Sequence, residues 1–202
     1  MIRRSLLALT AASAVALALP AMASVKTGNA APEFTAVDSN GVSHNLSDFA
    51  GKTVVLEWTN HGCPYVVKHY DSGNMQAIQK AATDDGVVWL SVISSAPGKQ
   101  GYVDGAGANA LTASRNASPT AVLLDPSGQV GRLYNAKTTP HMYVINGEGN
   151  VVYQGAIDNT PSTRASDIPT STNYVTAALE AVENGQTPAT TQSEAYGCSV
   201  KY

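Results

Sequence analysis

The sequence predicts a single α/β domain in which helices flank a central mixed β-sheet. Two apolar, β-branched runs at residues 53–58 and 87–93 are separated by a helical pattern. That spacing is typical of two parallel strands joined by a right-handed helical crossover. Residues 141–154 predict an antiparallel hairpin, because strand patterns flank the turn signal NGEG at 146–149. A final helix is expected over residues 174–184, where alanines and a tyrosine share one face.

An N-terminal extension precedes the first buried run. Residues 32–37 predict a short strand and residues 42–46 a second one, with the turn signal SNG at 39–41 between them. Residues 47–51 predict one helical turn that ends at a glycine. The extension is therefore expected to contribute β structure ahead of the main sheet.

The long helical pattern begins at Pro64 and continues to about Thr83. The tetrapeptide DSGN at 71–74 predicts a kink, or a break into two helices. Residues 94–106 predict a Gly/Ser loop at the carboxyl edge of the sheet, where ligands of α/β folds usually bind. The other expected elements are a helix at 109–115, a strand at 121–124, a short helix ending at Tyr134 and a polar linker at 187–196.

Residues 1–23 are predicted to be a secretory signal peptide. Arg3 and Arg4 form a positive start, an apolar stretch spans residues 6–19, and AMA at 21–23 is a cleavage site. A retained membrane anchor is the alternative, although the apolar stretch is short for a membrane span. Cleavage leaves residues 24–184 as the domain and residues 185–202 as a C-terminal tail. The expected location is the periplasm, with secretion as the second choice.

The charge pattern argues against two classes of partner. The chain has 12 Lys and Arg against 15 Asp and Glu, a net charge of −3. Losing Arg3 and Arg4 leaves 10 against 15, or about −5. No Lys/Arg run remains, so neither nucleic acid nor an anionic membrane is an expected partner. No second apolar span follows, so the mature chain is not expected to sit in a membrane.

Cys63 is the predicted redox nucleophile. It follows the first buried run and a short loop, and Pro64 stands where the next helix begins. The helix macrodipole and the unpaired N–H groups of a helix start stabilise a thiolate, which is the reactive form. The alternative is an inert buried thiol or one half of a structural disulfide.

Cys198, in the tail, is the other cysteine of the chain. In an oxidising compartment it could act as a resolving thiol for Cys63, within the chain or across a dimer. A permanent disulfide that holds the tail against the domain is the alternative. Redox cycling is favoured, because a permanent bridge would consume Cys63.

Three motifs carry a resemblance to a known family: GCPYV at 62–66, TTPHMYVI at 138–145 and GEGNVVYQG at 147–155. Together with the N-terminal extension, they resemble the thioredoxin fold in its AhpC/TSA, or redoxin, form. That group includes peroxiredoxins and periplasmic thiol–disulfide oxidoreductases. The resemblance implies a thioredoxin-like fold with an N-terminal β extension and a C-terminal tail.

The sequence departs from both branches of this family. A thioredoxin-like C-x-x-C motif would need a cysteine where Val66 stands. The peroxiredoxin motif would need proline and threonine where Leu56 and Asn60 stand. An arginine that peroxiredoxins carry near the position of Pro140 is also missing. The chain therefore has the shared nucleophile and the complete signature of neither branch.

The resemblance also implies roles for residues around Cys63. Pro140 is expected to be a cis-proline that exposes the Thr139 backbone to substrate, and Glu57 matches a buried acid that could shuttle a proton. Substrate contacts are further expected from Asn60, His61 and Pro64.

His61 or His141 could instead pair with the thiolate, although a role without catalysis is favoured for both. The four histidines lack metal-ligand spacing, so no metal or cofactor is expected.

The function predicted from the sequence is an exported thiol oxidoreductase with antioxidant activity. Cys63 would attack a disulfide or a small peroxide, Cys198 would resolve, and a thiol protein would donate electrons. The alternative is a non-catalytic binding module of thioredoxin fold, with a structural Cys63–Cys198 disulfide or a copper-chaperone-like role. The sequence does not give the oligomeric state.

Overall fold

The computed structural model describes residues 25–202, so the predicted signal peptide lies outside the described part of the chain. Nine strands are found in this part. They are β1 (Thr35–Asp38), β2 (Ser43–Asn45), β3 (Val54–Trp58), β4 (Val88–Ile93), β5 (Ala121–Leu124), β6 (Thr138–Thr139), β7 (His141–Ile145), β8 (Val151–Gly155) and β9 (Cys198–Ser199). The helices are α1 (Pro64–Asp71), α2 (Asn74–Asp84), α3 (Gly105–Ser114), α4 (Gln129–Leu133) and α5 (Tyr174–Glu183), with 3₁₀ turns η1 (Leu46–Phe49) and η2 (Ala165–Thr170).

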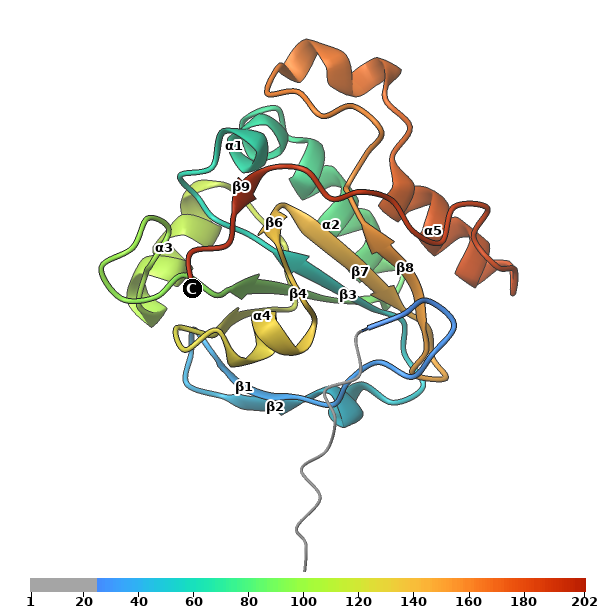
Figure 1. Ribbon diagram of the computed structural model, residues 1–202, viewed down its shortest axis with the longest axis horizontal. Coiled ribbons are helices and arrows are strands. Elements are labelled where there is room, and N and C mark those ends of the chain that lie inside the picture. The colour runs from blue at the N-terminus through green and yellow to red at the C-terminus, as the bar shows by residue number, and fades with distance from the viewer. Residues whose placement is uncertain (1–24) are drawn as a thin grey trace, which may run out of the picture.

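Seven of these strands form one mixed sheet in the order β2-β1-β5-β4-β3-β7-β8 (Figure 1). Strands β3, β4 and β5 run parallel, whereas the outer pairs on both sides are antiparallel. The βαβ unit, the hairpin and the N-terminal β extension predicted from the sequence are all present. The prediction of a thioredoxin-like fold is confirmed.

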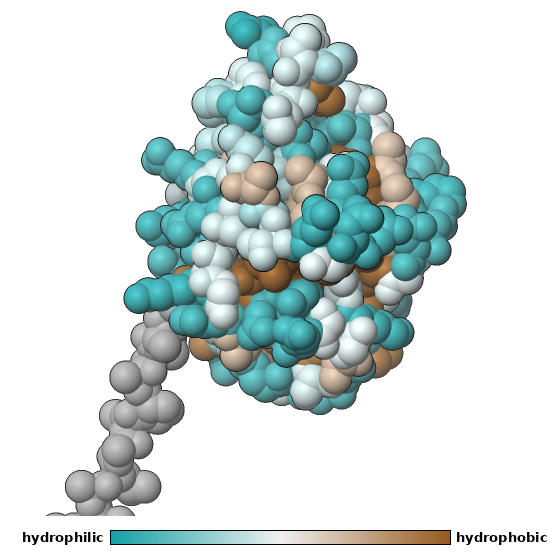
Figure 2. Space-filling view, turned by 90° about the vertical axis from the view of Figure 1, so that its right-hand side faces the viewer, coloured by the Kyte–Doolittle hydropathy of each residue, from teal (hydrophilic) through white to brown (hydrophobic). Residues whose placement is uncertain are grey.

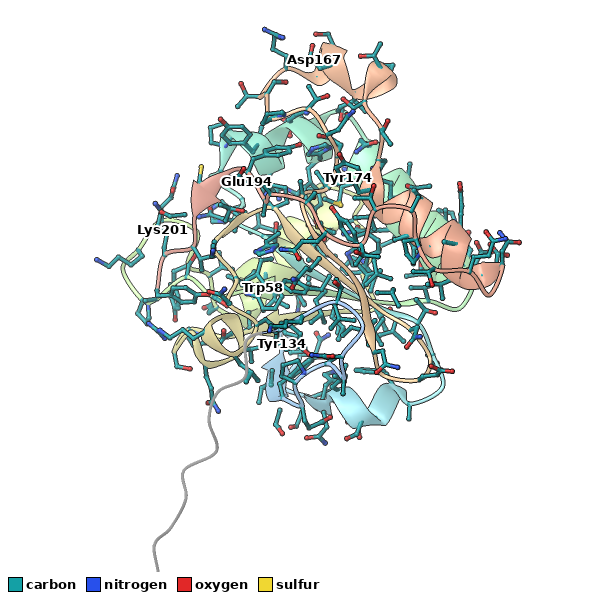
Figure 3. The ribbon with its side chains drawn as sticks, turned by 45° about the vertical axis from the view of Figure 1, so that its right-hand side comes forward. Trp58, Tyr134, Asp167, Tyr174, Glu194 and Lys201 are labelled. Atoms are coloured by element: carbon teal, nitrogen blue, oxygen red, sulfur yellow. The ribbon has the colours of Figure 1, made fainter. Side chains whose placement is uncertain are left out.

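The core lies on both faces of the sheet, because successive strand residues point to opposite sides. In β3, Val54, Leu56 and Trp58 join one apolar cluster, and Val55 joins the other together with Cys63. Trp58 is fully buried against Tyr134, with ring centroids 5.5 Å apart (Figure 3). Trp58 is therefore a core residue.

Two helix boundaries show how local chemistry sets the backbone. The predicted break in the long helix occurs at Gly73, which adopts a left-handed φ of 76° between α1 and α2. The helix expected at 109–115 begins earlier than predicted, at Gly105. The reason is an N-cap: the Asp104 carboxylate accepts a hydrogen bond from the Gly107 N–H at 2.8 Å.

The C-terminal tail follows the surface of the domain rather than hanging free. The Gln154 N–H in β8 donates to the Thr191 carbonyl at 3.1 Å, and the Ser193 N–H donates back to Gln154. The tail then pairs as strand β9 with β6, just before the start of β7 (Figure 1). The segment expected to be a polar linker thus brings Cys198 against β6, in a two-stranded sheet separate from the main one.

The face on the α5 side is mostly hydrophilic, with apolar side chains showing between the polar ones (Figure 2). Within residues 25–202, the helices are all too short or too polar to cross a membrane.

Candidate redox site

Cys63 stands where the loop after β3 enters α1. It is the N-cap residue, and Pro64 occupies the first helical turn, where its missing N–H costs nothing. The Cys63 carbonyl accepts hydrogen bonds from the N–H groups of Val66 and Val67, each at 2.9 Å. The residue is completely buried. The predicted helix-start position is therefore occupied, but the sulfur is covered by other parts of the chain.

The Thr139–Pro140 peptide bond covers the sulfur from one side, and it is cis, as expected. The Thr139 carbonyl is turned toward Cys63, whose Sγ donates a hydrogen bond to it at 3.0 Å. Thr139 itself is almost completely buried. The cis-proline segment therefore contacts the cysteine directly.

Strand β9 covers the sulfur from another side. It pairs antiparallel with β6 so that Cys198 lies opposite Thr139. The Cys198 N–H points at Cys63 Sγ, with nitrogen and sulfur 3.4 Å apart. Both cysteines are free thiols in this structure. The fold thus brings together two cysteines that are 135 positions apart in the sequence.

The two thiols have opposite electrostatic environments. Burial pushes the pKa of Cys63 upward, but hydrogen bonds from Cys198 and Thr139, together with the backbone N–H groups of Cys198 and Val66, outweigh burial and lower it. Burial and the interaction with Cys63 raise the pKa of Cys198 to about 11. Cys63 is therefore the group that ionises first, and Cys198 remains a hydrogen-bond donor to it.

Replacing Cys198 by alanine is expected to raise the pKa of Cys63, because the strongest hydrogen bond to the thiolate is lost. In the wild type, the fraction of Cys63 thiolate falls only as pH drops through the lowered value. In Cys198→Ala it should already fall at higher pH. A pH titration of thiolate ultraviolet absorbance measures both curves without needing reagent access to the buried sulfur. Coincident titration curves for wild type and Cys198→Ala would contradict the role of Cys198 as a hydrogen-bond donor to the Cys63 thiolate.

Glu57, one of the predicted site residues, is fully buried in β3. Its carboxylate accepts hydrogen bonds from four side chains at 2.8–3.0 Å: those of Tyr70, Gln79, Trp89 and Ser91. Burial outweighs these bonds and raises the pKa of Glu57. Within residues 25–202, no direct hydrogen bond links the carboxylate to either cysteine. A proton-shuttle role for Glu57 remains a prediction.

Asn60 and His61 shape the loop that leads to Cys63. The Asn60 side chain accepts a hydrogen bond from the Gly62 N–H at 2.9 Å and donates one to the Gln100 carbonyl at 3.2 Å. The His61 carbonyl accepts a hydrogen bond from Arg115 at 3.2 Å. Burial, aided by the charge of Arg115, lowers the pKa of His61. Their predicted substrate contacts remain predictions.

The His141 ring contacts the backbone of Lys137 and the ring of Tyr143. Its Nδ1 accepts a hydrogen bond from the Lys137 N–H at 3.2 Å, and its ring packs on Tyr143. Burial and the nearby charge of Lys137 lower its pKa to about 4, so the ring is neutral at physiological pH. Within residues 25–202, the hydrogen bond of the His141 ring goes to the Lys137 backbone and not to either cysteine.

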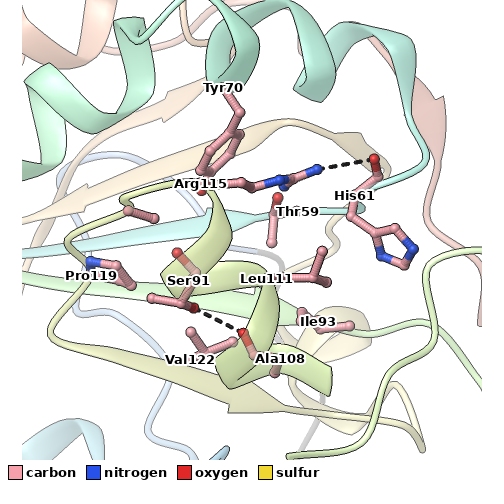
Figure 4. A pocket seen from close by; sticks show the side chains of 12 residues that line it. Thr59, His61, Tyr70, Ser91, Ile93, Ala108, Leu111, Arg115, Pro119 and Val122 are labelled. Carbon is pink, nitrogen blue, oxygen red and sulfur yellow. Dashed lines mark hydrogen bonds between the residues drawn. The ribbon is translucent and has the colours of Figure 1, made fainter. Parts of the chain in front are cut away.

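A cavity of about 40 Å³ lies beside the loop that precedes Cys63 (Figure 4). Arg115 crosses it, with the guanidinium 4.7 Å from the centre of the Tyr70 ring. The hydroxyl of Thr59, which also lines it, is buried and has no partner among the described residues. The volume suits an ordered water that would satisfy this hydroxyl. Neither cysteine lines the cavity.

In the described part of the chain, no three His, Cys, Asp or Glu side chains cluster closely enough to form a metal site. The copper-chaperone alternative therefore gains no ligand set from residues 25–202.

Sequence reasoning missed the residues that seat the tail. Gly197 has a φ of 137°, and a Cβ at this position would lie 2.0 Å from the Thr139 carbonyl oxygen. A glycine directly before Cys198 was a visible signal for such a close approach. The Tyr196 hydroxyl donates to the buried Asp158 carboxylate, and Asp158 is paired with Lys68. No sequence pattern links these three residues, because they belong to three separate segments.

The fold and the site define a class of protein: a thioredoxin-fold protein with one helix-capping cysteine opposite a cis-proline. The chain belongs to the Redoxin family, whose sequence model matches residues 26–171. This confirms the resemblance inferred from the motifs.

Two of the most similar known proteins are redox proteins. The thiol-disulfide oxidoreductase ResA of Bacillus subtilis is 28% identical over 136 residues, which are 64% of this chain and 66% of ResA. The exposed lipoprotein thioredoxin of Streptococcus pneumoniae is 26% identical, with a TM-score of 0.50 over 69% of this chain and 97% of that one. Both agree with the predicted class of enzyme, a thiol oxidoreductase.

An uncharacterized conserved protein from Geobacillus kaustophilus resembles this chain over a longer stretch. Its TM-score is 0.74, covering 88% of this chain and 92% of that one, at 21% identity. At that identity the likeness shows the fold alone.

Proposed function

We propose that this protein is an exported thiol–disulfide oxidoreductase in which Cys63 and Cys198 form and break one disulfide. The observation that carries the proposal is the contact between the Cys198 N–H and Cys63 Sγ at 3.4 Å, in register with Thr139. The activity of the relatives and the lowered pKa of Cys63 support it.

In the reducing half of the cycle, a donor thiolate attacks the Cys198 sulfur of the disulfide. Cys198 is partly exposed, whereas Cys63 is completely buried, so the incoming thiol reaches Cys198 first. The S–S bond breaks, Cys63 leaves as its stabilised thiolate, and a mixed disulfide joins Cys198 to the donor. A second donor thiol then attacks the donor's own sulfur and releases Cys198 as a thiol.

In the oxidising half, the Cys63 thiolate attacks an oxidant. With a disulfide, it forms a mixed disulfide and expels one thiolate, and Cys198 then displaces the other. A small peroxide is the second candidate oxidant. Attack on its O–O bond would convert Cys63 to a sulfenic acid, and condensation with the Cys198 thiol would give the disulfide and water. The complete burial of Cys63 favours a small oxidant.

The proposed location is the periplasm, with secretion as the second choice. The pattern of residues 1–23 supports export, and the pneumococcal relative is described as an exposed lipoprotein. The proposed electron donor is a thiol protein. An exported protein with a reducible disulfide needs such a donor because its surroundings are oxidising.

The test is to follow the disulfide by mass. Protein reduced with dithiothreitol and then freed of it is treated with stoichiometric glutathione disulfide or hydrogen peroxide. The expected product has lost two hydrogens and yields a Cys63–Cys198 cross-linked peptide, and dithiothreitol restores the starting mass. Cys63→Ser and Cys198→Ser are the controls that form no such bridge. The faster of the two oxidants identifies the substrate class.

The binding-module alternative predicts other results. A structural Cys63–Cys198 disulfide would resist dithiothreitol in the folded protein. A copper carrier would retain copper through dialysis, and the loss of that copper in Cys63→Ser would identify the ligand. Either result would contradict the proposed redox cycle.

A further inference from the structure

We propose that Tyr196, Asp158 and Lys68 form a latch that positions Cys198 against Cys63. Among the described residues, the side chains of these three make no hydrogen bond to a cysteine sulfur, and the redox cycle above uses none of them directly. The inference rests on the proposed function, because the latch serves the formation of the Cys63–Cys198 disulfide.

The inner part of the latch is a buried ion pair. The Lys68 side chain is completely buried on α1, and its Nζ lies 3.5 Å from Oδ2 of Asp158. It also donates to the Thr160 carbonyl at 3.3 Å. Asp158, 3% exposed, lies just beyond the end of β8. Because a buried charge is costly without its partner, this pair fixes the Asp158 carboxylate to the helix that Cys63 begins.

His69 does not take over the role of Lys68. Its Nε2 is 3.7 Å from the Asp158 carboxylate, beyond hydrogen-bond distance. Its Nδ1 accepts a hydrogen bond from Asn74 at 2.8 Å. Burial lowers the pKa of His69 to about 4, so the ring is neutral and Lys68 supplies the positive charge.

The outer part of the latch belongs to the tail. The Tyr196 hydroxyl donates a hydrogen bond to Oδ1 of the same Asp158 carboxylate. The Tyr196 ring also meets Tyr65 of α1 edge to face, with centroids 5.6 Å apart. The residue two positions before Cys198 is thus fixed to α1, the helix whose first turn follows Cys63. Both cysteines are positioned from one rigid element.

The tail needs such an anchor because its own strand is very short. Strand β9 consists of two residues, and the next backbone bond runs from the Val200 N–H to the Lys137 carbonyl at 3.0 Å. Gly197, directly before β9, contributes no side-chain contact. Besides the pairing with β6, the nearest contacts that hold Cys198 are therefore those of Tyr196 on one side and Val200 on the other.

The experiment compares Tyr196→Phe with Tyr65→Phe. The first variant keeps the ring and loses the hydrogen bond to Asp158. The second removes the hydroxyl from the other ring of the same pair, and within residues 25–202 that hydroxyl makes no hydrogen bond. Each protein is equilibrated with glutathione and glutathione disulfide, and the oxidised fraction is measured by mass after acid quenching. In this exchange, two glutathione thiols lose two electrons and two protons to the enzyme's disulfide and form glutathione disulfide.

The expected result is that Tyr196→Phe lowers the equilibrium constant for forming Cys63–Cys198 by about tenfold, the effect of losing a hydrogen bond to a charged group. This corresponds to a reduction potential about 30 mV less negative. Tyr65→Phe should change the constant by less than about twofold. Equal constants in wild type and Tyr196→Phe would overturn the latch.

Amide hydrogen exchange of the reduced protein gives a second readout. Faster exchange of the peptide that contains Cys198, in Tyr196→Phe and not in Tyr65→Phe, is expected because an unlatched tail opens more often. This holds whether or not the disulfide forms. If the wild type forms no disulfide but the exchange difference appears, the proposed function fails and the latch remains. If the disulfide forms and the exchange rates are equal, the latch fails and the proposed function remains.

Discussion

Replacing Gly197 by alanine is expected to slow formation of the Cys63–Cys198 disulfide by about 100-fold, the loss typical of a misplaced reacting group. The new Cβ would lie 2.0 Å from the Thr139 carbonyl oxygen and 2.7 Å from its carbon. These are backbone atoms beside the cis peptide bond, so they cannot turn away as a side chain could. At a φ of 137°, an L-residue is also strained. Strand β9 must therefore separate from β6, which takes Cys198 away from Cys63.

The measurement is the rate of disulfide formation after addition of glutathione disulfide, followed by acid quenching and mass. Gly185→Ala is the matched control, because Gly185 also has a positive φ, of 66°, but nothing lies within 4 Å of its Cβ position. Gly185→Ala should lower the free energy of unfolding, because alanine is strained at a positive φ, but it should form the disulfide at the wild-type rate. If Gly197→Ala is as fast as this control, Cys198 does not react from strand β9.

Replacing Glu57 by alanine is expected to lower the free energy of unfolding by about 4 kcal/mol. The side chain is fully buried, and its removal leaves four buried donors without their acceptor. An unsatisfied buried donor costs about 1–3 kcal/mol, and the cavity left behind adds to the loss. Urea unfolding at about pH 4, below the ordinary pKa of a glutamate, provides the measurement.

Glu33→Ala is the control for this variant, because Glu33 is exposed and, among residues 25–202, accepts hydrogen bonds only from Ser47. It should cost less than about 1 kcal/mol. An equally small loss in Glu57→Ala would contradict the structural role of the carboxyl.

The stability of the wild type should also depend on pH through Glu57. Its folded pKa is raised by burial, so its contribution is complete below the unfolded pKa and is lost as pH rises through the folded value. Glu57→Ala should lack that decline.

The sequence predicted the fold well because strong, local patterns specify its central elements. The buried runs that became β3 and β4 are apolar except for Glu57 and Ser91, as expected of parallel strands covered on both faces. The glycine at position 73 predicted the break between α1 and α2, and the residues NGEG at 146–149 predicted the hairpin turn. The start of α3 was less visible, because it depends on whether the Asp104 carboxylate turns toward the Gly107 N–H, and an aspartate in a loop has many other options.

Only those parts of the site that lie within a short stretch of sequence could be predicted. Cys63 and Pro64 are adjacent, and Thr139-Pro140 forms a recognisable motif, so one stretch of sequence reveals each of them. The approach of Cys198 to Cys63 depends on the path of the tail over β8 and past β6. That path is set by contacts such as the one between Tyr196 and Asp158, which join distant segments. Sequence spacing carries no information about such contacts, so an intrachain pairing could only be one option among several.

The pairing of β9 with β6 has a consequence for molecules that bind at the cis-proline. The backbone edge of β6 beside a reactive cysteine is a surface on which an extended polypeptide could add as a strand, and here the tail already occupies it. A tethered segment competes at an effective concentration on the order of millimolar. The apparent dissociation constant of any visiting polypeptide is therefore its intrinsic value divided by the fraction of time that the tail is away. A reactant small enough to pass the seated tail is exempt from this competition, so the tail filters reactants by size.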